Sequence, residues 1–342
     1  MDDSKFGKRD KRGHWTPDGV LTPAPVFVLP PNPLKFLRWL PNYFFPWNAF
    51  FMVTAAIFWF FLTPGAETTR TFSVGWIALI FARNLAAFFL FYGVIELRLY
   101  KLRRQEARFK YNPNFPDDKK NTVFLFGSQA YDSIIRGVGT GVTIWTAIEV
   151  VTLWAFANNY VPMATFKDDP VWLACIVLFV PVFHEAYFFA IHRALHIPAL
   201  YKFVHSVHHN SVNPSPWSSL AMHPVEHLLF FGEALIHLVI FSHPLVAIYN
   251  LHSLALGAVV GHVGFDKIET GEEGGLDTHA YAHYLHHKYF EVNYADGLIP
   301  FDKWFGTWHD GTKDGDEAMN ARWQKKLQRE NARKAAQEGN QA

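Results

Sequence analysis

The sequence is nearly free of cysteine and carries little net charge. Because Cys175 is the only cysteine, an internal disulfide and a CxxC metal or redox motif are both excluded. The formal net charge of +1 at pH 7 gives no basic footprint, so no nucleic-acid partner is expected. No signal peptide is expected either, since residues 1–12 are charged and no short apolar run follows them directly.

Apolar and aromatic side chains are abundant instead. Half of the 342 residues are hydrophobic, 17% are aromatic, and there are 33 phenylalanines. So many large rings would leave apolar patches on a soluble domain, which indicates a membrane protein rather than a soluble all-α protein with buried helices. A hydrocarbon core about 30 Å thick needs roughly 20 apolar helical residues. The predicted spans are residues 47–63, 72–97, 134–157 and 171–191.

A fifth apolar region, residues 228–264, is interrupted by His237, His243 and His252. It is predicted to form two short helices in a hairpin that dips into the membrane. Basic residues cluster before the first span and between the second and third, whereas residues 64–71 and 158–170 hold one each. The positive-inside rule therefore places both termini in the cytosol. The predicted fold is all-α and integral to the membrane, with four transmembrane helices in two hairpins, the dipping hairpin and a cytosolic histidine-rich cap.

This pattern divides the chain into four segments. They are a cytosolic or interfacial N-terminal segment (1–46), a transmembrane region (47–180), a histidine-box catalytic domain (181–311) and a polar C-terminal helix or tail (312–342). Prolines at 31, 33, 41 and 46 predict an irregular strap in the first segment. In the second, Arg83 and Glu149 fall inside spans, and an ion pair between helices is preferred over contact with a lipid headgroup.

Histidine is the chemically informative residue. All but one of the 18 histidines follow residue 180, in the sequences HRALH (192–196), HSVHH (205–209), HPVEH (223–227) and HYLHH (283–287). Spacings of three and four bring imidazoles to one side of a helix, and imidazole binds Fe, Zn, Cu or Ni. With few carboxylates nearby, each ion would need four or five nitrogens, so the number of histidines suits two ions. The predicted metal ligands are His192, His196, His205, His208, His209, His223, His227, His262, His279, His283, His286 and His287.

Within this set, the histidines of HRALH, HSVHH and HYLHH are also the predicted catalytic residues. Neighbouring groups could orient the rings by accepting the second imidazole N–H. The residues predicted for this outer role are His184, Glu185, Glu226, Asp266 and Asp277. His14, His237, His243, His252 and His309 are expected to be hydrogen-bonded packing residues.

From about residue 181 to residue 311 the chain resembles the fatty acid hydroxylase/sterol desaturase superfamily. The resemblance is carried by EAYFFAIHRALH, FVHSVHH, HPVE, GHVGF and HYLHHKYFEVNYADGLIPFDKWFGTWHDG, in that family's order. It implies a di-iron oxidase that uses O₂ as co-substrate to hydroxylate, desaturate or cleave a lipid, with zinc possible in the isolated protein. Carried over by motif, the implied ligands are His192, His196, His205, His208, His209, His262, His283, His286 and His287.

Two departures from the family pattern stand out. Glu185 occupies a position where the family usually has Asp, and NYADG replaces the more usual NYG. The sequence carries no cytochrome b5-like domain, so electrons are expected from a separate reductase, ferredoxin or cytochrome b5-type protein. A bacterial inner membrane is slightly preferred over the endoplasmic reticulum, with the active site on the cytosolic face.

Three other classes fit the residues less well. A membrane zinc hydrolase would carry HExxH, but the pattern begun at His184 and Glu185 fails at Phe188. A metal transporter would place its ligands near the middle of its spans. A bis-histidine haem protein needs only two or four histidines. The lipid itself stays open among a sterol, a fatty acyl chain, a hydroxylated membrane lipid and an alkylglycerol ether.

Overall fold

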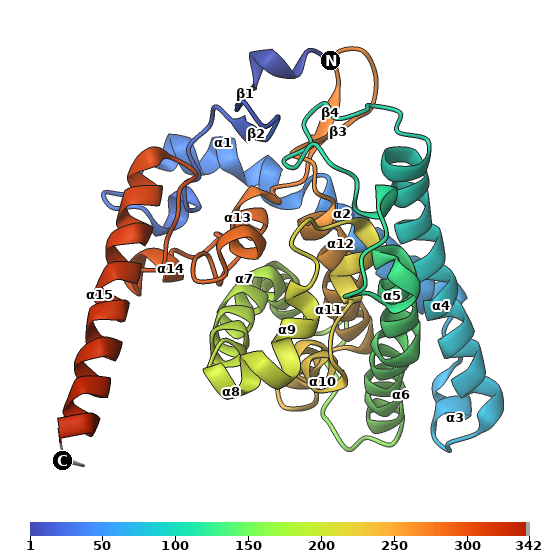
Figure 1. The fold of residues 1–342 in the computed structure, drawn as a ribbon. Helices are drawn as coiled ribbons and strands as arrows, with labels where there is room; N and C mark the ends of the chain where they lie inside the picture. The colour runs from blue at the N-terminus through green and yellow to red at the C-terminus, as the bar shows by residue number, and fades with distance from the viewer. Residues whose placement is uncertain (340–342) are drawn as a thin grey trace.

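The computed structural model describes residues 1–339, with side chains up to residue 332. The last three residues of the predicted tail lie outside this range. The protein is mostly helical, with two small antiparallel sheets of two strands each (Figure 1). Strand β1 (Gly7–Arg9) pairs with β2 (Trp15–Pro17), and β3 (Lys267–Glu269) pairs with β4 (Gly275–Asp277). The expected all-α membrane fold is therefore confirmed, apart from these two unforeseen hairpins.

Four helical segments are long and apolar enough to cross a membrane. Large apolar side chains such as Leu90, Val171 and Phe179 remain exposed on them, as lipid-facing residues do. The first segment joins α4 (Val74–Glu96) to a π-helical turn (Leu97–Lys101), and the second joins α5 (Gln129–Arg136), a π-helical turn (Gly137–Val142) and α6 (Thr143–Ala157). The third is α7 (Pro170–Leu195), and the fourth combines α11 (Pro244–Ala255) with α12 (Gly257–His262).

The structure differs from the predicted spans in two places. Helix α2 (Trp47–Phe61) has 15 residues and reaches spanning length only together with α1 (Pro33–Phe44), across a bend of 41°. Conversely, the second half of the predicted dipping hairpin forms the 19-residue segment Pro244–His262. Its His252 does not meet lipid, because the ring is buried against Phe58 and Trp145 and lies 3.1 Å from Thr54 Oγ1.

The predicted proline strap is partly wrong, because α1 is a helix of 12 residues. Pro33 stands in the first turn, where a missing N–H costs nothing, and Asn32 caps the helix by accepting a hydrogen bond from Lys35 N at 3.0 Å. Pro41 lies inside the helix, but only one turn before its end. Whether a helix forms here depends on where each proline lies within it, and not on the number of prolines.

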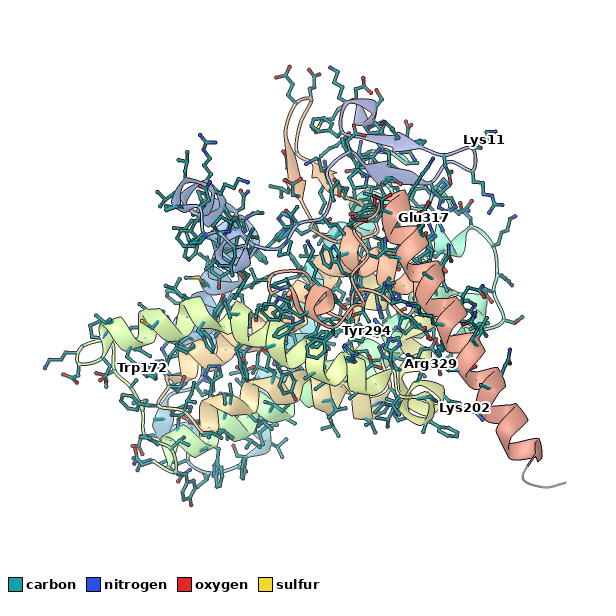
Figure 2. The ribbon with its side chains drawn as sticks, turned by 90° about the vertical axis from the view of Figure 1, so that its left-hand side faces the viewer. Lys11, Trp172, Lys202, Tyr294, Glu317 and Arg329 are labelled. Atoms are coloured by element: carbon teal, nitrogen blue, oxygen red, sulfur yellow. The ribbon has the colours of Figure 1, made fainter. Side chains whose placement is uncertain are left out.

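Helix α11 lies at the centre of the bundle, where it packs against α2, α6 and α7. It is the second arm of a hairpin whose first arm is α10 (Pro224–Gly232), continued by the 3-10 turn Glu233–Leu238. The turn of this hairpin is tied to the loop before α7: Ala164 N donates to Ser242 O at 2.8 Å, and Trp172 Nε1 donates to Phe241 O at 2.7 Å. Figure 2 shows Trp172 at the end of α7 remote from Tyr294.

A second polar cluster sits among the spans. Arg83 on α4 forms an ion pair with Glu149 on α6 and donates to Thr63 Oγ1 at 2.8 Å. Asn84 donates to the same carboxylate at 3.0 Å. Both charges are nearly fully buried, with 4% and 1% of their side chains exposed. These contacts agree with a structural pair between helices.

The remaining elements connect the spans or follow them. Helix α15 (Lys313–Gly339) confirms the helical form of the predicted C-terminal tail and lies at the side of the molecule in Figures 1 and 2. The other short α-helices are α3 (Ala66–Thr69), α8 (Pro198–Leu200), α9 (Ser206–His209), α13 (Tyr281–Tyr289) and α14 (Phe301–Trp304).

Candidate metal centre

Four helical segments bring the histidine boxes together. Helix α7 ends with His192 and His196, and the residues Ile197-Pro198 that follow prevent its continuation. The next segment contains a π-helical turn, Tyr201–His205, directly before α9. Such turns occur often at functional sites, because the extra residue redirects the side chains. The other contributors are the C-terminal end of α12 and the whole of α13.

Nine histidines form two compact groups. In each group, one ligand atom per residue lies within 4.8 Å of all the others. Group one is His192, His196, His205, His209 and His286. Group two is His208, His262, His283 and His287. Apart from His196, every one of these side chains is buried.

The two HxxHH helices divide their histidines between the groups in a reciprocal way. The first gives His205 and His209 to group one and His208 to group two. The second gives His283 and His287 to group two and His286 to group one. Residues four apart lie on nearly the same line along a helix, while the residue three apart lies to the other side. The two groups therefore sit next to each other, and the rings of His209 and His287 are 5.0 Å apart.

Within each group the ring nitrogens converge closely. In group one, His209 Nε2 lies 3.0 Å from His205 Nε2 and 3.1 Å from His286 Nε2. In group two, His262 Nε2 lies 3.0 Å from His283 Nε2 and 3.1 Å from His208 Nε2. Two nitrogens bound at about 2.1 Å to one ion, at right angles, would be about 3 Å apart.

The hydrogen bonds of the outer ring nitrogens show which inner nitrogens carry a lone pair. His192, His286 and His262 each donate Nδ1–H to a backbone carbonyl, of Tyr294 at 2.8 Å, Val292 at 2.7 Å and Ala258 at 2.8 Å respectively. A carbonyl only accepts, so the Nε2 atom of each neutral ring carries a lone pair. Lone pairs that face one another need a cation between them. The donor set thus fits a transition-metal ion in each group.

Burial also keeps the imidazoles uncharged. Desolvation, reinforced by the neighbouring rings, lowers the pKa of six of these histidines well below 6.5. Neutral imidazole is the form that binds metal. The six are His205, His208, His209, His283, His286 and His287.

Three other predicted ligands belong to neither group. His223 Nδ1 accepts a hydrogen bond from Val225 N at 3.2 Å and so caps α10. His227 Nδ1 lies 2.9 Å from Thr140 Oγ1. His279 lines the adjoining cavity without joining a group. The nine-residue set, without these three, is the one carried into the proposal below.

Of the five residues predicted to orient the rings, Glu226 contacts a histidine of group one. Its Oε1 lies 2.8 Å from His205 Nδ1. Glu185 instead accepts from the backbone N–H of Gly297 at 2.8 Å, and so holds the loop after α13. Asp266 accepts from Tyr111 at 3.1 Å, Asp277 pairs with Lys267, and His184 pairs with Glu233.

The loop after α13 contains functional residues that the spacing of histidines did not reveal. Its carbonyls at Val292 and Tyr294 orient two rings, and the Tyr294 ring lies 4.9 Å from that of His196. Asn293 Nδ2 ties the loop to His309 O at 3.0 Å, and buried Asp302 accepts from Tyr294 N at 3.0 Å. Every residue has a carbonyl, so only the NY sequence hinted at this loop.

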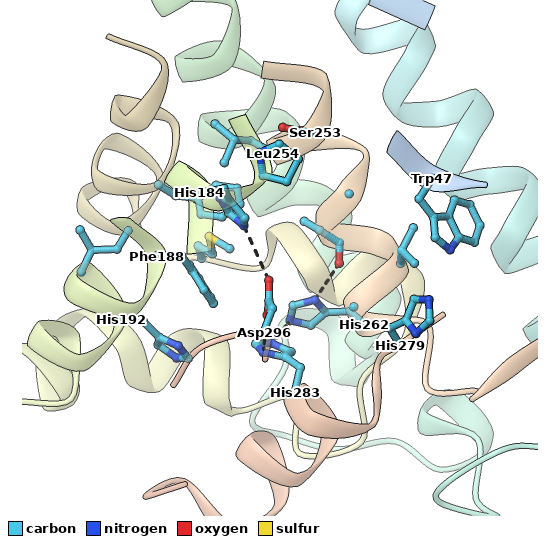
Figure 3. A pocket seen from close by; sticks show the side chains of 18 of the residues that line it. Trp47, His184, Phe188, His192, Ser253, Leu254, His262, His279, His283 and Asp296 are labelled. Carbon is cyan, nitrogen blue, oxygen red and sulfur yellow. Dashed lines mark hydrogen bonds and ion pairs between the residues drawn. The ribbon is translucent and has the colours of Figure 1, made fainter. Parts of the chain in front are cut away.

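An apolar cavity of about 1180 Å³, counted with its open mouth, adjoins the groups (Figure 3). His192, His205, His208, His262 and His283 form one part of its wall. Much of the rest is apolar and comes from α2, α7, α10, α11 and the loop before α10, including Phe51, Phe188, Met222, Phe230 and Leu254. A concave site of this composition suits a hydrocarbon body next to the metal groups.

The sequence of this region matches known proteins. Residues 177–307 match the family model described as Fatty acid hydroxylase. A Delta(7)-sterol 5(6)-desaturase of Gibberella zeae is 30% identical over 141 residues, covering 40% of this chain and 42% of that protein. Methylsterol monooxygenase 1 of Gallus gallus is 31% identical over 129 residues, covering 37% and 43%. A fatty acid hydroxylase of Mycosarcoma maydis is 30% identical over 146 residues, covering 40% and 34%.

These matches coincide with most of the predicted catalytic segment 181–311. The aligned part of this chain covers less than half the length of each of these three relatives. No solved structure matches the chain.

Proposed function

We propose that this chain is a member of the fatty acid hydroxylase/sterol desaturase superfamily, since residues 177–307 match the fatty acid hydroxylase model, and that it is a membrane-bound di-iron oxidase that uses O₂ to hydroxylate or desaturate a lipid. The observation that carries the proposal is the pair of adjoining imidazole groups in the wall of an apolar cavity. A zinc hydrolase or a transporter would need neither two such groups nor a lipid-sized cavity beside them.

The nine grouped histidines would hold the metal, four or five nitrogens to each ion. When bound, two iron ions would supply O₂ activation and oxidation of a C–H bond. The carbonyls of Tyr294, Val292 and Ala258 fix three rings in the tautomer that presents Nε2 inward. Glu226 does the same for His205 through its carboxylate.

The cavity would place the lipid. The Phe188 ring lies 4.8 Å from that of His192 and 6.3 Å from that of His283, so an apolar chain lying on Phe188 would run past both groups. The aromatic wall keeps bulk water away from the reacting carbon. We retain residues 181–311 as the catalytic domain and residues 47–180 as the membrane region.

The reaction needs electrons, and we propose that a separate reductase, ferredoxin or cytochrome b5-type protein supplies them. We propose that the active site lies on the cytosolic face, because the basic loops are expected there by the positive-inside rule. The three relatives come from eukaryotes, and this favours the endoplasmic reticulum over the bacterial inner membrane preferred from the sequence.

The test is metal analysis, an optical spectrum and lipid mass spectrometry on one preparation. We expect two irons per chain, no Soret band, and a cellular lipid that gains one oxygen or loses two hydrogens when the protein is expressed. A preparation that contains only zinc would be reconstituted with ferrous iron before the assay, since zinc can replace iron during purification.

His208→Ala should abolish turnover and lower the iron content, because it removes one nitrogen from a four-membered group. His223→Ala is the matched control: it removes a histidine only fifteen positions away that belongs to neither group. Full iron loading and full activity in His208→Ala would refute the ligand assignment. A haem spectrum would refute the di-iron proposal itself.

A further inference from the structure

The apolar cavity contains a polar cluster that holding the metal does not require. His184 projects into the cavity from α7, and Asp296 faces it from the loop after α13 (Figure 3). The nearest atoms, His184 Nε2 and Asp296 Oδ2, are 3.7 Å apart. This is too long for a direct hydrogen bond, but one oxygen atom placed beside the pair could bond to both.

The histidine of this cluster is held in a fixed orientation. Its Nδ1 lies 2.7 Å from Oε2 of Glu233, a carboxylate of which 1% is exposed. The second oxygen of Glu233 accepts from Asn250 Nδ2 at 2.8 Å. The ring also stacks on Phe188 at 5.5 Å. A carboxylate buried among apolar helices is costly, and such groups mark functional sites. Here the arrangement aims His184 Nε2 at the cavity.

The two facing atoms select the chemistry of the ligand. Asp296 is an acceptor as a carboxylate, and 48% of its side chain is exposed to the space in front of it. His184, paired with the Glu233 carboxylate, can offer Nε2–H as a donor. A hydroxyl group donates one hydrogen bond and accepts others, so it satisfies both partners. A ketone or ester can only accept, and a carboxylate or phosphate would be repelled by Asp296.

We propose, resting on the lipid-oxidising function above, that His184 and Asp296 bind the hydroxyl group of a lipid alcohol. The other oxygen of Asp296, Oδ1, lies 4.0 Å from His283 Nδ1, so one imidazole ring separates this carboxylate from the inner nitrogens of group two. The hydroxyl-bearing carbon therefore sits close to the metal groups, and the carbon oxidised lies only a few bonds from it. Acyl chains without a free hydroxyl are poor substrates.

Equilibrium binding to the iron-loaded protein in detergent tests this assignment. The probes are two matched pairs, cholestanol with cholestane and hexadecanol with hexadecane. We expect the alcohol of at least one pair to bind about 10- to 100-fold tighter than its hydrocarbon, as hydrogen bonds to charged partners provide. The pair with the larger ratio identifies a sterol-like or a linear body.

Asp296→Ala should remove most of this preference while the affinity for the hydrocarbons stays the same. His184→Phe keeps a ring against Phe188 and gives a second variant if the first does not fold. Asp168→Ala, which removes an exposed carboxylate from the loop before α7, should leave the preference intact. Iron content reports whether each variant retains its metal groups.

Equal binding of alcohol and hydrocarbon by the unmodified protein would overturn the assignment, as would full preference in both cavity variants. The outcomes that would refute the proposed function are different ones. A protein that prefers alcohols but oxidises no lipid would refute the oxidase and leave the hydroxyl site standing. Lipid oxidation without any hydroxyl preference would refute the hydroxyl site alone.

Discussion

The two histidine groups are alike in composition but differ in how their rings are held. In group one, the outer nitrogens of His192, His205 and His286 bond to Tyr294 O, Glu226 and Val292 O. In group two, the outer nitrogen of His262 bonds to Ala258 O.

Among the described residues, the outer nitrogens of the other three group-two histidines are buried without a hydrogen-bond partner. These are His208, His283 and His287, whereas in group one the same is true of His209 alone among the described residues. Three of the four group-two rings also line the cavity. The comparison shows that pre-organisation and access to the cavity are divided: more of the rings in group one are held by hydrogen bonds, and more of the rings in group two line the cavity.

Removing one histidine from one group at a time should have the largest effect on turnover and should distinguish the two groups. His287→Ala leaves three nitrogens in group two, whereas His196→Ala leaves four in group one. We expect turnover to fall at least about 100-fold in His287→Ala, with loss of one iron, and less in His196→Ala. Iron analysis and single-turnover assays measure both. Equal losses would show that ligand number does not distinguish the groups.

Glu226→Gln should have the second-largest effect, because it weakens only the hydrogen bond that supports His205 in group one. The amide oxygen can still accept the imidazole N–H but no longer carries charge. We expect the affinity for one of the two irons to fall about 10- to 100-fold while the other is retained. Chelator titration followed by Mössbauer spectroscopy would resolve the two ions. Parallel loss of both irons would contradict the independence of the groups.

Acid should destabilise the metal-free protein, because both groups require neutral rings. The pKa values of buried His205, His208 and His286 lie well below 6.5, so the unfolded chain binds more protons than the folded one below that pH. Stability is therefore fully present above pH 6.5 and falls as the pH drops below it. The thermal midpoint should drop by several degrees between pH 7.5 and 5.5. A constant midpoint would show that folding does not lower the pKa values of these rings.

The smallest effect is expected from the other buried polar cluster. Arg83 and Glu149 satisfy each other within the bundle, and Asn84 donates to the same carboxylate. Replacing both together, by Arg83→Met with Glu149→Leu, should leave iron content and turnover nearly unchanged. Arg83→Met alone should cost about 3–5 kcal/mol by leaving a buried charge unpaired. Loss of activity in a stable double variant would assign the pair a role in substrate binding.

The sequence predicted the parts of the site that depend on regular spacing. Histidines three and four apart in the HRALH, HSVHH and HYLHH boxes identified eight of the nine grouped residues, and the GHVGF motif supplied His262. Spacing could not show that His223 and His227 turn away from the groups to bond with Val225 N and Thr140. Local capping and a neighbouring helix decided those two side chains.

Long-range contacts account for what the sequence missed in the fold. Residues 228–264 were predicted to be too interrupted for a full span, because His237, His243 and His252 punctuate them. His252 is the one of the three that lies well inside helix α11. Its ring packs on Phe58 and Trp145, which are far away in sequence. Likewise, Asp296 and Glu233 gave no motif, since each acquires its role only when the loop after α13 meets α7 and α10.

The hairpin whose turn contains Ser242 determines the order in which the parts of the site can assemble. Its arms supply Glu226 and His262 to the histidine groups, while its turn is fastened to Ala164 and Trp172. During synthesis, HRALH and HSVHH emerge before this hairpin exists, and HYLHH emerges after it. Both groups therefore gain their full set of histidines only after this hairpin and α13 are in place beside α7, so the metal loading proposed above would be a late step in biogenesis.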